Sequence, residues 1–71
     1  MIYALIEKQT GEVFKFDDSK VIGSLKEVKL FKAKYIRLAT NNYKTFNECD
    51  FLLAREWAKK VFDEMAYIKK I

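Results

Sequence analysis

The stretch Thr45–Lys70, with the sequence TFNECDFLLAREWAKKVFDEMAYIKK, carries the strongest periodic pattern in this chain of 71 residues. At about 100° per residue, its apolar side chains fall on one half of a helix and most of its charged side chains fall on the other. Thr45 and Glu48 have the spacing of a capping box, which marks a helix start. We therefore predict one long amphipathic helix, whose apolar side must cover another element.

The element that this helix covers is predicted at the N-terminus. Ile2–Lys8 and Glu12–Asp17 are β-rich runs separated by Gln9-Thr10-Gly11, which is typical of a hairpin loop with a left-handed glycine. This loop would place Lys8 opposite Glu12. The face toward the helix would then be apolar, with Ile2, Ala4, Ile6, Phe14 and Phe16. The outer face would be mixed, with Tyr3, Leu5, Glu7, Val13, Lys15 and Asp17.

The middle of the chain has a weaker pattern. Alternation predicts a further strand at Lys34–Ala39, which Thr40-Asn41-Asn42 would end as a loop. Within residues 18–33, Ser24 and Glu27 repeat the capping-box spacing and favour a short helix. Because Val28 and Leu30 also alternate with lysines as in a strand, the structure of residues 18–33 stays open here.

Together these elements predict an α+β fold with a single domain over residues 1–71. The expected architecture is a small antiparallel sheet, made of the N-terminal β-hairpin plus one or two further strands, covered on one face by the long C-terminal amphipathic helix. A core this small provides about 3 to 5 kcal/mol of stability. Burial of further surface in an oligomer would compensate for it.

The composition bounds the partners and the location. There are 14 Lys and Arg against 10 Asp and Glu, a net charge of +4, which modestly favours acidic partners. No secretory signal pattern and no run of about 20 apolar residues occurs, so we expect a cytoplasmic protein without a membrane partner.

Catalytic chemistry has little support. The chain has no histidine, one cysteine and two glycines, so it lacks the usual general base, zinc spacings and phosphate loops. Cys49 near a helix start is interpreted as a structural thiol, and the adjacent Asp17 and Asp18 as a turn. We expect a protein that is not an enzyme, with no catalytic residue, metal, cofactor or small-molecule substrate.

Protein binding is the first functional hypothesis. Some apolar residues fall outside the predicted core: Leu5 and Val13 on the outer sheet face, and Leu52 and Tyr67 on the charged half of the helix. Together they suggest an apolar patch for a protein partner or a second copy of the chain. Small size and absent catalytic groups would suit a regulatory polypeptide, such as those of mobile elements.

Nucleic-acid binding, either DNA or RNA, is the alternative hypothesis. The outer sheet face would show Tyr3, Lys15, Tyr35 and Arg37, in which aromatic rings alternate with cations. Rings can stack on bases and cations can contact phosphates. These four residues are the candidate nucleic-acid site.

One resemblance adds to the second hypothesis. Tyr43-Lys44-Thr45-Phe46, followed by a helix through Ala54, Trp57 and Ala58, resembles the strand-to-helix junction of integrase arm-binding and plant ethylene-response DNA-binding domains. Those families place a three-stranded sheet in the major groove with a helix behind it. This chain departs from them in the long segment between its second and third predicted strands. The resemblance implies DNA binding, and no residue role is carried over from it.

Overall fold

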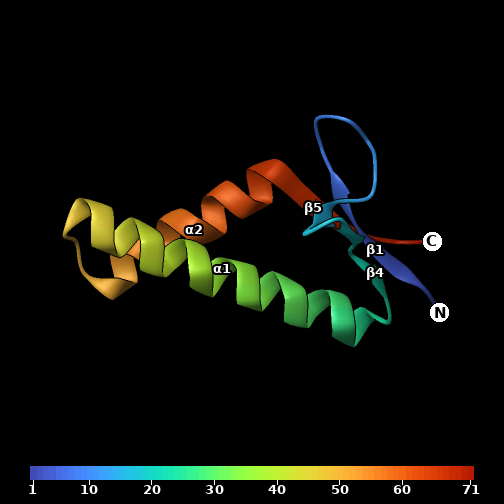
Figure 1. Cartoon of the computed structure of the whole chain (residues 1–71), viewed down its shortest axis with the longest axis horizontal. Helices are drawn as coiled ribbons and strands as arrows, with labels where there is room; N and C mark the ends of the chain where they lie inside the picture. The colour runs from blue at the N-terminus through green and yellow to red at the C-terminus, as the bar shows by residue number, and fades with distance from the viewer.

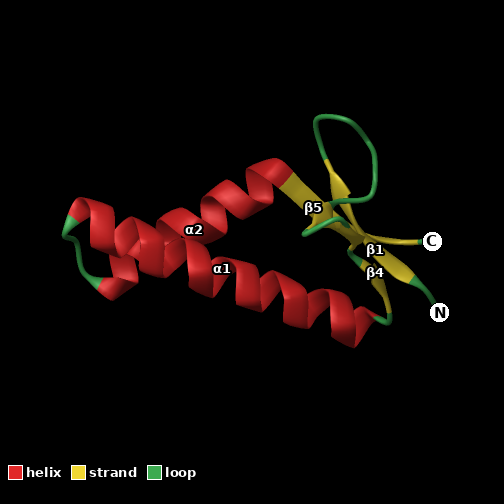
Figure 2. Ribbon diagram, viewed as in Figure 1, coloured by secondary structure: helices red, strands yellow, loops and turns green.

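The computed structural model describes residues 1–71 and shows an α+β fold with a helical hairpin that extends from one face of a small sheet (Figures 1 and 2). In chain order the elements are β1 (Tyr3–Glu7), β2 (Lys15–Phe16), β3 (Ser19–Lys20), β4 (Ile22–Gly23), α1 (Leu25–Asn47), α2 (Phe51–Met65) and β5 (Ala66–Lys70). The molecule measures 40 × 24 × 20 Å, and both termini lie at the sheet end (Figure 1). No helix is both long and apolar enough to span a bilayer.

The sheet is antiparallel with the strand order β4-β1-β5, so the N-terminal strand is its centre. β5 pairs with all of β1, from Tyr3 opposite Lys70 to Glu7 opposite Ala66. β2 and β3 form a separate two-stranded ribbon. The predicted α+β class with a small antiparallel sheet is confirmed, but its longest strand pair joins the two ends of the chain.

The hairpin register differs from the prediction by one residue. Gly11 has φ +74°, which confirms the left-handed glycine, but Ile6 opposes Val13 instead of Phe14. The Glu7 N–H donates to the Glu12 C=O at 2.8 Å, so the loop is one residue longer than predicted. A slip of one residue exchanges the two faces of a strand. Leu5 therefore points toward the helices, and Ala4 and Ile6 point away from them.

The predicted strand Lys34–Ala39 and loop Thr40-Asn41-Asn42 are both wrong, because these residues lie inside α1. The helical preference in residues 18–33 was closer to the structure, since Ser24 caps α1 and forms a capping box with Glu27. The helix continues past Thr40, and the buried hydroxyl of Thr40 donates to the Ile36 C=O at 2.6 Å, so this polar group is satisfied within the helix.

The single long helix over Thr45–Lys70 is also wrong at both ends. Thr45 lies inside α1, and Glu48 ends α1 with a left-handed φ of 50°. Asp50 then caps α2 by accepting the Leu53 N–H at 2.8 Å. After Met65 the chain is extended as β5, and its pairing with β1 satisfies backbone N–H and C=O groups along that edge of β1.

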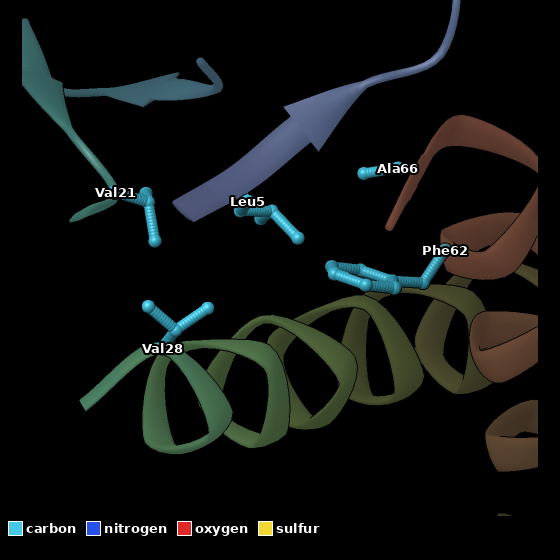
Figure 3. Close-up of a cluster of buried hydrophobic side chains, with 5 residues drawn as sticks. All are labelled: Leu5, Val21, Val28, Phe62 and Ala66. Carbon is cyan, nitrogen blue, oxygen red and sulfur yellow. The ribbon is translucent and has the colours of Figure 1, made fainter. Parts of the chain in front are cut away.

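The core lies between the sheet and the sheet-proximal parts of both helices (Figure 3). Its five buried residues are Leu5, Val21, Val28, Phe62 and Ala66. Tyr35 packs edge-on against Phe62 with ring centroids 5.6 Å apart, and Phe14 contacts Phe31 at 6.1 Å. Trp57 is not part of this core, since its side chain is 39% exposed.

The capping box of α1 has a measurable consequence. Hydrogen bonds from the backbone and the side chain of Ser24 hold the pKa of Glu27 below its usual value, because they stabilise the ionised carboxylate. Their contribution to stability is therefore present above the usual carboxyl pKa and is lost as the pH falls through the lowered pKa. We expect Ser24→Ala to raise the pKa of Glu27, measured by NMR titration of its carboxyl carbon. Ser19→Ala should leave that pKa unchanged. Because Ser24→Ala keeps the backbone N–H bond and removes only the side-chain bond, an unaltered titration would contradict the contribution of the Ser24 hydroxyl.

Candidate functional site

The helical hairpin of α1 and α2 presents two chemically different faces. Thr40, Ala54 and Ala58 are buried where the helices meet, and two of these three side chains are alanines, so the backbones approach closely. The parts of both helices far from the sheet pack only on each other (Figure 1). The helix pair therefore has two exposed sides, one on each side of this contact, and both helices contribute to each side.

On one side lies a groove of about 510 Å³, which we call the basic groove. Its lining residues come from both helices: Lys29, Lys32, Ala33, Ile36, Arg37, Thr40, Phe51, Arg55 and Lys59. Five of them are cations and none is a carboxylate. This concentration of one sign of charge gives the groove a positive electrostatic potential.

Only one groove cation has an acidic partner. Lys32 lies 3.6 Å from Asp63, the only salt bridge in the chain, and 5.3 Å from the Phe62 ring centroid. Lys29, Arg37, Arg55 and Lys59 have no carboxylate within salt-bridge distance. Four cations of the groove are thus free to neutralise an external anion.

On the opposite side lies the apolar hairpin face, which we define by Leu38, Phe46, Leu53 and Trp57. Helical geometry places these residues on the flanks of α1 and α2 that point away from the basic groove. Their exposed fractions are 46% for Leu38, 86% for Phe46, 58% for Leu53 and 39% for Trp57. The Trp57 ring of α2 stacks on Tyr43 of α1 with centroids 4.1 Å apart, so this ring pair bridges the two helices.

The predicted protein-binding residues occupy three places. Val13 and Tyr67 both oppose Ile6, one on each side of β1, so the structure places them on the same face of the sheet. Leu52, which is 72% exposed, lies at the start of α2, at the other end of the molecule (Figure 1). Leu5 is 0% exposed in the core, so its expected outward position is wrong and it is unavailable to a partner.

The predicted nucleic-acid residues do not form one surface. Tyr3 and Tyr35 pack against the core, and Tyr35 contacts both Phe14 and Phe62. Lys15 is exposed on β2, and only Arg37 lines the basic groove. The expected face of alternating rings and cations is therefore wrong, because Lys34–Ala39 is helical and contributes no strand to the sheet.

The other groove cations, Lys29, Lys32, Arg55 and Lys59, were missed from the sequence. Arg55 and Lys59 have the i, i+4 spacing that puts two side chains on one helix face, and Lys29 lies two helical turns before Arg37. This signal was present, but it has meaning only once residues 25–47 are known to be one helix that packs beside α2.

The structure contains no group of three His, Cys, Asp or Glu residues that could hold a metal ion. Cys49 is half-buried in the connection between the helices. The resemblance to strand-to-helix DNA-binding junctions does not hold, because Tyr43, Thr45 and Phe46 lie in the last turns of α1. No family model, curated protein or solved structure matches this chain. Fold and surfaces together define a small α+β protein with an amphipathic helical hairpin.

Proposed function

We propose that this chain is a non-enzymatic binding module that pairs with a second copy of itself through the apolar hairpin face. The observation that carries this proposal is the row of exposed large side chains, Leu38, Phe46, Leu53 and Trp57, on one side of two packed helices. Several large apolar side chains exposed on one side of a protein are typical of an interaction site.

The total surface area supports an interface of ordinary size. A compact monomer of 8.4 kDa is expected to expose about 4,600 Å². This chain exposes 5454 Å². The excess of about 800 Å² is close to what each partner buries in a stable protein–protein complex. The helical hairpin, which extends beyond the sheet, is the natural source of this excess (Figure 2).

The charge distribution favours a second copy on the apolar side of the hairpin. Two basic grooves would repel each other, whereas the rim of the apolar hairpin face carries both signs, with Lys34, Lys60 and Glu64. A two-fold axis lets one apolar surface meet its own copy. Two hairpins joined in this way form a four-helix arrangement with both basic grooves on the outside.

Leu53→Glu is the test of this interface. A carboxylate at this position would be desolvated in the pair, so we expect the dimer to dissociate at concentrations where the unchanged protein is dimeric. Sedimentation equilibrium between about 1 μM and about 100 μM would show a shift in the dissociation constant of at least about tenfold. Leu30→Glu is the matched control, because Leu30 is 60% exposed on α1 and lies outside the apolar hairpin face.

Equal effects of Leu53→Glu and Leu30→Glu would contradict the interface, and so would an unchanged protein that stays monomeric throughout this range. The circular dichroism spectrum of both variants should equal that of the unchanged protein, since neither leucine is buried. Added salt should leave apolar pairing unchanged or strengthen it, because it screens the net positive charge of the two copies.

A further inference from the structure

We propose that the basic groove binds the backbone of a single-stranded nucleic acid. This goes beyond self-association and uses the opposite side of the helical hairpin. The groove residues that would contact phosphates are the four cations without an acidic partner, Lys29, Arg37, Arg55 and Lys59.

The charge of the groove selects an anion. The whole chain carries a net charge of +4, yet five of the groove's nine lining residues are cations and no acid lies among them. At the end of the groove near the sheet, Lys32 forms a salt bridge with Asp63. The remaining four cations face solvent with their charge uncompensated, which raises the local concentration of a polyanion.

The spacing of the cations selects an extended anion over a small one. Lys29 and Arg37 are eight residues apart, which is about 12 Å along α1. Arg55 and Lys59 are about 6 Å apart along α2 on the facing wall. A free phosphate would reach one or two of these side chains, whereas a phosphodiester chain can follow both rows.

The groove also contains a ring for a base. Phe51 lies at its wall and is 49% exposed, and Ile36 contributes an apolar floor beside it. An unpaired base can stack on such a ring, while the bases of a duplex are already stacked inside the helix. The combination of cations with an exposed ring therefore favours a single strand over a duplex and over an acidic peptide.

The test is fluorescence anisotropy of a labelled, mixed-sequence single strand of about 16 nucleotides, as DNA and as RNA. We expect binding that weakens with salt, with a slope of about −2 to −2.8 in a plot of log affinity against log salt concentration, for three or four phosphate contacts. Binding that is absent at low salt, or equally tight for a duplex or for polyglutamate, would overturn the proposal.

Two pairs of substitutions locate the site. The double variant Arg37→Gln with Arg55→Gln removes two charges from the groove, and we expect at least about tenfold weaker binding. Lys20→Gln with Lys70→Gln removes the same charge from exposed residues of β3 and β5 that do not line the groove, and should change binding by less than about threefold. Equal weakening by both pairs would overturn the groove as the site and indicate attraction by net charge.

Phe51→Leu separates stacking from charge. This substitution keeps an apolar side chain at the groove wall but removes the ring, so we expect about fivefold weaker binding with the salt slope unchanged. Unaltered affinity would overturn the contribution of Phe51. The Leu53→Glu variant should bind the oligonucleotide as tightly, per chain, as the unchanged protein does. Loss of self-association and loss of nucleic-acid binding can therefore be distinguished.

Discussion

Phe62→Ala is expected to unfold most of the protein. Phe62 is 1% exposed and is the largest fully buried side chain. It packs on Tyr35, and Figure 3 shows its ring between α1 and the strands that carry Leu5 and Ala66. Truncation of such a side chain costs about 3 to 5 kcal/mol, which equals the whole stability expected for a chain of this size.

Urea unfolding followed by circular dichroism measures this loss, with the chain at a concentration where it is monomeric. Phe46→Ala is the matched control, because its ring is 86% exposed and should contribute less than about 0.5 kcal/mol to the monomer. A loss below about 1 kcal/mol for Phe62→Ala would show that the core is not organised around this ring.

The second large effect is expected from Lys69→Pro in β5. Lys69 opposes Ala4. The Ile71 N–H donates to the Ile2 C=O, and N–H groups alternate in direction along a strand, so the Lys69 N–H also points toward β1. Proline removes this donor and leaves the carbonyl of the fully buried Ala4 without its partner. We expect a loss of at least about 2 kcal/mol in the free energy of unfolding.

Lys70→Pro is the neighbouring control for this prediction. Lys70 opposes Tyr3, and the same alternation points its N–H to the free edge of the sheet, where proline is tolerated. The expected loss is below about 1 kcal/mol, measured in the same unfolding experiment. Two equally damaging prolines would indicate that Ala66–Lys70 continues α2 as a helix instead of forming β5.

The correct predictions from sequence all depend on neighbouring residues. Gly11 takes the left-handed conformation that its loop requires, and Ser24 with Glu27 forms the capping box that starts α1. Hydrophobic patterning also indicated that an antiparallel sheet packs against an amphipathic helix. In each case the signal and the structure lie within a few residues of each other.

The wrong predictions arose where two local patterns competed. Thr45 and Glu48 have capping-box spacing, but Asp50 caps α2 and Thr45 donates to the Asn41 C=O within α1. Ile36 and Leu38 alternate as in a strand, although a helical stripe through Val28, Ile36 and Thr40 lies along the same segment. Packing against α2 and the sheet decides in favour of the stripe, because it buries those side chains together.

The amino-acid order alone determined the class of the fold, its main turn and the start of α1, since these depend on contacts within one or two turns of chain. Tertiary structure decided the hairpin register, the change from helix to strand at Ala66, and the meeting of Arg37 with Arg55 across a groove. These features join distant segments, and their free energy comes from burial and strand pairing that no local window contains. For that reason the candidate surfaces of this protein became visible only after its two helices were placed side by side.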